Sequence, residues 1–171
     1  MICTDAACGA SIPPLSGSYL SWLGGANAET AEIRQTATLP AGKPAFLSYA
    51  YQLLSNDYCG YDYGYVQVIV NGVTRTLKRY SLCTSAETNA WTGAQFDLSA
   101  YAGSRVTVVF RARTDYSYSS SFFVDDVAIT QASTCTAAVA GVERADDVLL
   151  MPEGGAPAKP NVPAGASSIE R

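Results

Sequence analysis

The sequence contains no histidine. Because histidine is the usual general base at neutral pH, its absence excludes serine–histidine–aspartate triads and histidine-ligated zinc. None of the five cysteines forms a CxxC pair, so a tetrahedral zinc site is not expected either. Motifs that place a nucleophile beside a base are missing as well. We therefore expect that this protein is not an enzyme.

Basic residues are few and scattered. The chain has 11 Lys and Arg against 15 Asp and Glu, a net charge of −4. Phosphate binding needs clustered cations, so no nucleic acid is expected as a partner. No run of eighteen apolar residues occurs, which predicts no membrane span. The first eighteen residues contain neither a basic residue nor an apolar core, so they do not read as a signal peptide.

Alternation of apolar and polar residues with a period of two dominates residues 17–131 and predicts β-strands. In segment 105–113 one face consists of Val106, Val108, Phe110 and Ala112, while the arginines face water. Asn71–Gly72 favours a tight hairpin turn between two further strands. The expected strands are Tyr19–Leu23, Ala31–Leu39, Ala45–Leu54, Tyr65–Val70, Val73–Tyr80, Gln95–Leu98, Arg105–Arg113 and Phe122–Thr130.

Eight or nine short strands leave no room for helical crossovers, so parallel α/β folds are excluded. The pattern predicts an all-β protein, an antiparallel two-sheet jelly-roll β-sandwich. We expect an N-terminal extension over residues 1–16, the sandwich over 17–135 and an extended tail or linker over 136–171. The tail has four prolines and no aromatic residue, and its Gly, Pro, Ala and Ser cannot bury enough apolar surface to order it.

Five cysteines without a metal motif indicate disulfides, and hence an extracellular or cell-surface protein. Cys59 and Cys83 flank the predicted hairpin, where the two strands converge, so we expect them to pair. A disulfide that closes a loop of about 25 residues stabilises the folded state by roughly 3 kcal/mol in the chain-entropy model. One of Cys3, Cys8 and Cys135 is expected to tie the two ends of the domain together. The odd cysteine is either free or paired with another chain.

Asp125 and Asp126 stand side by side in an otherwise apolar run, residues 122–129. Successive side chains of a strand face opposite sides, so one carboxylate is expected to approach the core, where an unpaired charge is costly. Backbone amides or an arginine can compensate it. A hard cation held by oxygen ligands, calcium above all, can do the same. In that second interpretation Asn27 and Glu29, from the glycine-rich loop before the second strand, complete the metal site.

Four segments occur in a characteristic order: Tyr19–Gly25, Ala37–Gly42, Leu98–Gly103 and Phe123–Val127. The ordered set resembles the MAM-like jelly-roll modules of bacterial secreted proteins. It is also similar to the cleaved-adhesin modules of surface proteases and to jelly-roll carbohydrate-binding modules. The similarity covers about residues 17–131.

This resemblance implies a module that accompanies a catalytic domain or a cell-surface protein. It also implies a structural calcium, with an aspartate of the Asp125–Asp126 pair and the loop near Asn27 and Glu29 as ligands. The five cysteines depart from the four-cysteine pattern of animal MAM domains. The function of those receptors is therefore not carried over to this chain.

Two segments that connect predicted strands, 56–65 and 114–121, hold six of the eleven tyrosines. If both lie at the same rim of the sandwich, they form an aromatic and acidic surface. Tyrosine rings bury area at a small entropic cost while their hydroxyls bond polar groups, so stacked sugar rings are a natural ligand. The alternative is that the rings cap the core and cover the Cys59 disulfide. The predicted ligand-binding residues are Tyr58, Tyr61, Tyr63, Tyr116 and Tyr118.

The same loops contain Asp57, Asp62 and Asp115, which offer paired carboxylates for glycoside hydrolysis. Aspartates in loops rich in Gly and Ser are more often turn formers or surface charges, and we interpret them in this way.

These observations predict a non-catalytic extracellular module that is stabilised by calcium and mediates adhesion or binds a glycan or protein surface. The alternative is a structural subunit of a surface layer or filament that self-assembles through its tail. Val148–Met151 is a short apolar patch there. It either packs on the sandwich edge or adds a strand to a neighbouring chain.

Overall fold

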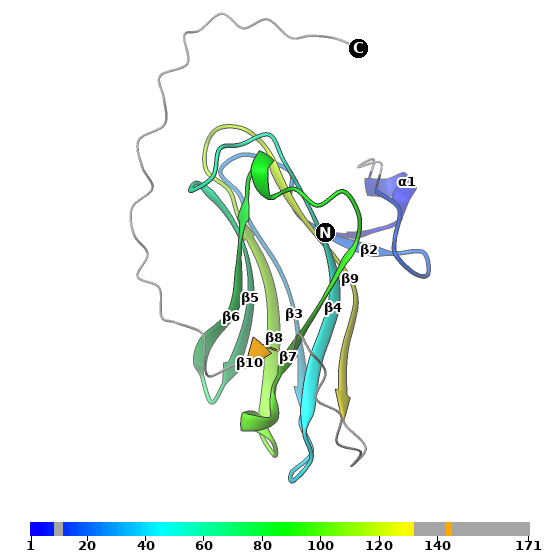
Figure 1. Ribbon diagram of the computed structural model, residues 1–171, viewed down its shortest axis with the longest axis vertical. Helices are drawn as coiled ribbons and strands as arrows, with labels where there is room; N and C mark the ends of the chain where they lie inside the picture. The colour runs from blue at the N-terminus through cyan, green and yellow to red at the C-terminus, as the bar shows by residue number, and fades with distance from the viewer. Residues whose placement is uncertain (9–11, 132–142, 145–171) are drawn as a thin grey trace, which may run out of the picture.

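The computed structural model describes residues 1–8, 12–131 and 143–144, which form two β-sheets packed face to face (Figure 1). One sheet has six strands in the order β1-β2-β9-β4-β7-β10, and the other has four in the order β3-β8-β5-β6. The short pairing of β7 with β10 is parallel and the other pairings are antiparallel. The predicted antiparallel jelly-roll β-sandwich is confirmed.

The strands are β1 (Ile2–Cys3), β2 (Leu20–Gly24), β3 (Thr30–Thr38), β4 (Ala45–Ser55), β5 (Asp62–Val70), β6 (Val73–Leu82), β7 (Thr92–Asp97), β8 (Arg105–Arg113), β9 (Ser120–Gln131) and β10 (Glu143–Arg144). One helical turn, α1 (Asp5–Cys8), and two 3-10 turns, Thr84–Ala86 and Ser99–Tyr101, complete the described elements. None of the helices in these residues is long and apolar enough to cross a membrane.

The main core lies between the two sheets, where the inward-facing residues of their strands meet. Tyr49, Tyr80, Phe110 and Phe122 form its aromatic centre, and all are buried. The hydroxyls of Tyr49 and Tyr80 share a hydrogen bond of 2.7 Å, which satisfies both polar ends inside the core. Burial and the neighbouring tyrosines raise the pKa of Tyr80 far above its usual value, so it stays neutral.

A second, smaller core lies on the outside of the six-stranded sheet. Phe123 points to this side and stacks on Trp22, with ring centroids 5.6 Å apart. The N-terminal residues Cys3, Cys8 and Ile12 pack against it. Strand β1, which contributes Cys3, pairs with β2. Two residues are too few for a period-two pattern, so the sequence did not indicate this strand.

The cysteines pair in two ways. Cys59 and Cys83 form the expected disulfide beside the β5–β6 hairpin. Cys3 and Cys8 form a second disulfide with each other. The expectation that one of them ties the two ends of the domain together is therefore wrong, because their partners are local. Cys135 lies outside the described residues.

Strand β6 is an edge strand of the four-stranded sheet. Its register with β5 shifts by one residue between the pairs Val66–Lys78 and Gln67–Thr76, so the edge carries a β-bulge. The predicted tail, including Val148–Met151, lies almost wholly outside the described residues. The division of the chain at residues 16 and 135 stays a prediction.

Three connections meet at one end of the sandwich, drawn at the top of Figure 1. They are the β2–β3, β4–β5 and β8–β9 loops. The amide of Asn56 donates to the carbonyl of Ser119 at 3.0 Å, and the amide of Thr114 donates to the carbonyl of Glu29 at 2.9 Å. These bonds hold the loops together, and we call this end of the sandwich the rim.

Candidate functional site

An acidic cluster, Asp57, Asp62 and Asp115, lies at the rim. Asp57 follows β4, Asp62 begins β5 and Asp115 lies two residues after β8. One carboxylate oxygen from each residue lies within 4.8 Å of those of the other two. The cluster forms because β5 begins and the adjacent strand β8 ends at this rim, and the β4–β5 loop leads into β5 here. It is the one group of three or more acidic or cysteine side chains close enough to share a metal ion in the described part of the chain.

Each carboxylate of the acidic cluster accepts a backbone N–H at its Oδ1 atom. Asp57 accepts from Tyr58 at 2.7 Å and Asp115 from Ser117 at 2.8 Å. Asp62 accepts from the amide of Asp115 at 2.7 Å, which joins two of the loops. The orientations of the three side chains are therefore set by the backbone.

The acidic cluster is unusually well buried for carboxylates. Asp57 is 1% exposed and Asp62 is 0% exposed, and Asp62 Oδ2 receives no hydrogen bond. Burial raises the pKa of Asp62, and the charges of Asp57 and Asp115 raise it further, against the Ser120 hydroxyl and the Asp115 amide, which lower it. Our interpretation of these residues as turn formers or surface charges was wrong for the two buried ones.

The sequence did contain a signal for Asp62. Period-two alternation in β5 places Asp62 on the same side as Gly64, Val66 and Val68, which are buried. Extending that register by two residues beyond Gly64 predicts an inward carboxylate. Asp57 carried no such signal, because it lies in a loop whose path depends on contacts distant in sequence.

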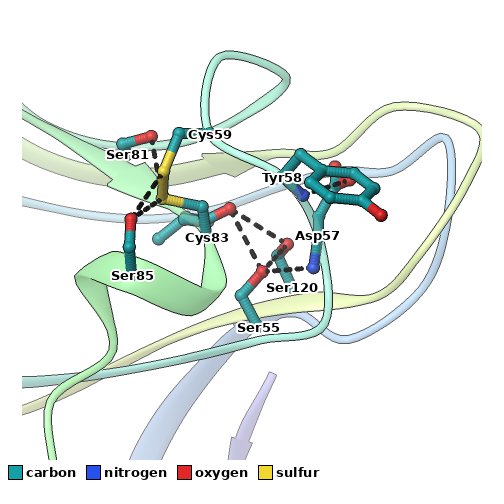
Figure 2. Close-up of a disulfide and its surroundings, with 9 residues drawn as sticks. Ser55, Asp57, Tyr58, Cys59, Ser81, Cys83, Ser85 and Ser120 are labelled. Carbon is teal, nitrogen blue, oxygen red and sulfur yellow. Dashed lines mark hydrogen bonds between the residues drawn. A yellow bond between two sulfur atoms is a disulfide. The ribbon is translucent and has the colours of Figure 1, made fainter. Parts of the chain in front are cut away.

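A hydroxyl network and a disulfide fix the loop that carries Asp57 (Figure 2). The hydroxyls of Ser55 and Ser120 lie 2.8 Å apart, and Ser55 Oγ also accepts the amide of Asp57 at 3.0 Å. Two residues after Asp57, Cys59 is bonded to Cys83, which is 1% exposed. The loop therefore has a defined path between β4 and β5.

Three of the five tyrosines predicted to bind a ligand lie exposed at the rim. Tyr116 is 78% exposed, Tyr58 50% and Tyr118 39%. Tyr58 and Tyr118 meet edge to face with ring centroids 6.1 Å apart. Tyr58 neighbours Asp57 in the chain and Tyr116 neighbours Asp115, so the structure brings the predicted aromatic and acidic groups to the same rim. Tyr61 is half-buried in the β4–β5 loop.

Tyr63 belongs to a different surface. It lies on the outward side of β5 with Tyr65, and their ring centroids are 6.2 Å apart. The guanidinium of Arg79, on the neighbouring strand β6, lies 4.7 Å from the centre of the Tyr63 ring, a cation–π distance. On the other neighbouring strand, β8, Arg111 lies directly opposite Tyr65 in the register. We call the outward residues Tyr63, Tyr65, Gln67, Arg79 and Arg111 the tyrosine–arginine face.

Charged and polar groups frame the tyrosine–arginine face. Arg111 donates through Nε and a terminal nitrogen to Glu32, at 2.9 and 2.7 Å, and Arg34 also pairs with Glu32. The hydrogen bonds from Arg111 lower the pKa of Glu32, so this carboxylate is charged over the whole neutral range. Gln67 donates to Thr76 at 3.0 Å, whereas its Oε1 receives no hydrogen bond.

Sequence reasoning missed Tyr65, Gln67, Arg79 and Arg111 as candidate binding residues. The signal was present, because the valines assigned to the core side of β5 leave the intervening residues on the outer side. The surface is built on strands, whereas the binding tyrosines were predicted in the loops.

The Asp125–Asp126 pair lies on β9 beside the N-terminal segment. Asp125 Oδ2 accepts the amides of Leu15 at 2.8 Å and Ser16 at 3.4 Å, and its Oδ1 accepts the amide of Asp126 at 2.7 Å. The hydroxyl of Ser16 donates to Asp126. Neither carboxylate enters the core, contrary to our expectation. A register shift interrupts the alternation, and Asp126 adopts a φ of 50°.

The other predicted calcium ligands lie at the rim, away from that pair. The side-chain Nδ2 of Asn27 donates to the carbonyl of Tyr116 at 3.3 Å, and the backbone amide of Glu29 donates to Thr114 Oγ1 at 2.9 Å. Strand β9 meets β2 at the pair Ser121–Gly24, and Asp125 lies four residues further along, roughly 13 Å at the rise of a β-strand. The structure therefore separates the predicted set into two places.

No family model matches the sequence. Bacillopeptidase F of Bacillus subtilis (strain 168) is 32% identical over 74 residues, which make up 43% of this chain and 5% of that protein. The match therefore spans only a small part of the relative's length.

Three solved structures of carbohydrate-binding modules are similar at low identity. TmCBM61 in complex with β-1,4-galactotriose has a TM-score of 0.48 at 14% identity, covering 77% of this chain and 88% of that one. A family 16 carbohydrate-binding module has a TM-score of 0.44 at 17% identity, covering 68% and 79%. The CBM4 structure has a TM-score of 0.41 at 15% identity, covering 77% and 86%.

Proposed function

We propose that this protein is a non-catalytic extracellular module that binds glycans through its tyrosine–arginine face. The observation that carries the proposal is the pair of rings at Tyr63 and Tyr65, 6.2 Å apart on one rigid strand. Strand-borne rings keep their positions without a ligand, so binding costs little ordering entropy.

The chemistry of the tyrosine–arginine face suits a sugar. A pyranose ring has an apolar C–H face, which packs on an aromatic ring, and a belt of hydroxyls, which needs polar partners. Beside the rings, Arg111 and Glu32 supply charged hydrogen-bonding groups. Gln67 Oε1 is a buried acceptor without a donor, and a sugar hydroxyl that reached it after a small side-chain movement would supply one.

The remaining parts of the proposal rest on other observations. Two disulfides favour an oxidising compartment, and hence an extracellular or cell-surface location. The exposed rim tyrosines Tyr58, Tyr116 and Tyr118 offer a second surface, for adhesion to a protein. The resemblance to MAM-like and cleaved-adhesin modules agrees with such a role. Structural calcium is part of the proposal and is argued separately below.

Tyr65→Ala is expected to weaken glycan binding at least about tenfold, or roughly 1.4 kcal/mol, because it removes one of the two rings on which a sugar would pack. The measurement is a glycan array probed with the parent protein and then titration calorimetry with the best ligand. β-1,4-Galactotriose, the sugar in the TmCBM61 structure, belongs among the first probes.

Two matched variants make the result specific. Tyr65→Phe keeps the ring and is expected to retain most of the affinity. Tyr116→Ala removes an exposed ring at the rim and is expected to leave it unchanged. If Tyr116→Ala abolishes binding while Tyr65→Ala does not, the ligand sits at the rim and the tyrosine–arginine face is wrong. A parent protein that gives no signal on the array would remove the glycan proposal altogether.

A further inference from the structure

We propose that the acidic cluster, Asp57, Asp62 and Asp115, is the binding site of one calcium ion that fastens the rim loops together. The site differs from the one predicted at Asn27, Glu29, Asp125 and Asp126, and it does not depend on glycan binding.

The first argument is the spacing of the oxygens. Calcium takes oxygen ligands at 2.3–2.6 Å, so two ligands on one ion lie at most about 5 Å apart. The three carboxylate oxygens lie within 4.8 Å of one another, which fits this limit without movement of the backbone. All three ligands are carboxylates, which are hard oxygen donors and suit calcium rather than a soft transition metal.

The second argument is independent of the spacing. Asp62 is completely buried, and its Oδ2 has no donor although its Oδ1 is satisfied by the amide of Asp115. A buried carboxylate oxygen without a partner costs free energy, and structures rarely leave one uncompensated. A cation among the three carboxylates supplies the missing partner of Asp62.

The third argument concerns what the ion would connect. The ligands come from the β4–β5 loop, the start of β5 and the β8–β9 loop. Glu29, whose backbone bonds to Thr114, brings the β2–β3 loop to the same place, and its Oε2 is also buried without a donor. A single ion at the cluster would therefore link segments far apart in sequence. Flexible Ca²⁺ coordination would also accommodate further ligands from backbone carbonyls or water.

The test is calcium chloride titrated into the full chain after removal of metal with a chelator, followed by calorimetry and thermal unfolding. We expect one site with a Kd of about 0.1–1 mM, as in other extracellular modules. At a hundredfold excess over Kd, the melting temperature is expected to rise by roughly 5–10 °C. Asp62→Asn keeps the acceptor for the Asp115 amide and removes the charge. It is expected to weaken calcium binding at least about tenfold.

Asp125→Asn is the matched control, because the carboxylate of Asp125 already accepts three backbone amides. It is expected to leave calcium binding unchanged. If it abolishes binding while Asp62→Asn does not, the ion sits on β9 and the proposal is overturned. No heat and no change in melting temperature with the parent protein would overturn it too. Should Asp62→Asn not fold, Asp115→Asn at the less buried ligand serves instead, with the same tenfold loss expected.

Discussion

Phe122→Ala is expected to lower the free energy of unfolding by about 3–5 kcal/mol, the range for removing a fully buried aromatic ring. Phe122 is 0% exposed and lies at the centre of the main core, with Tyr80 at 5.5 Å and Phe110 at 6.4 Å between ring centroids. The cavity cannot close easily, because Phe122 lies on the six-stranded sheet and both neighbours lie on the facing four-stranded sheet, where strand pairing holds them.

Gly64 shows how closely the ring of Phe122 is packed. A Cβ atom at Gly64 would lie 3.0 Å from the Phe122 ring, so the strand has a glycine where the ring needs the space. The loss of unfolding free energy in Phe122→Ala is measured by chemical denaturation. The slope of that free energy against denaturant concentration should be the same in the variant and the parent. Leu54→Ala is the control, because Leu54 on the neighbouring strand is 46% exposed and should cost about 0.5 kcal/mol or less. Similar losses for the two variants would contradict the packing described for Phe122.

Replacing Cys59 and Cys83 together by alanine is expected to lower the free energy of unfolding by about 3 kcal/mol. The disulfide joins two cysteines with a sequence separation of 24. Without it, the unfolded chain regains the conformational entropy that the closed loop removes. A second effect is local. Cys59 lies two residues after Asp57, so the loop that positions the acidic cluster should also become less ordered.

Thermal and chemical unfolding of the double variant measure the first effect. The comparison is the pair of substitutions Cys3→Ala and Cys8→Ala, whose disulfide spans a separation of only 5. The chain-entropy model makes that loss about 1 kcal/mol smaller. If the Cys59–Cys83 variant unfolds at the same denaturant concentration as the parent, the crosslink does not stabilise the fold.

Local patterns were enough to predict the eight longer strands, β2 to β9. The alternation in Arg105–Arg113 predicts both ends of β8 correctly, and the other expected strands begin and end within three residues of those observed. Such patterns succeed because each strand has one side in the core and one in water, which period two records directly. The same logic placed Cys59 opposite Cys83, since hairpin pairing is local.

The failures came where the backbone departs from regular geometry. Alternation predicted an inward carboxylate at Asp125 or Asp126, but the register shift on β9 turns both away from the core. Cys3 and Cys8 pair across a single helical turn, α1. Four residues are too few for a periodic pattern to predict that turn. The sequence analysis named the three aspartates together but did not predict a buried cluster, because its members come from two loops and a strand end that only the folded chain brings together.

The edge of the four-stranded sheet has a consequence for the behaviour of concentrated solutions. An unprotected edge strand invites the edge of another molecule to continue its hydrogen-bond ladder. Strand β6 carries Arg75, Lys78 and Arg79, so a second copy that docked there antiparallel would bring like charges together. The bulge beside Gln67 also twists the edge out of the plane that a continuing ladder needs. We therefore expect that the β6 edge does not nucleate aggregation by strand pairing between molecules. The tyrosine–arginine face, which includes Arg79 of this strand, can then stay accessible in concentrated solution.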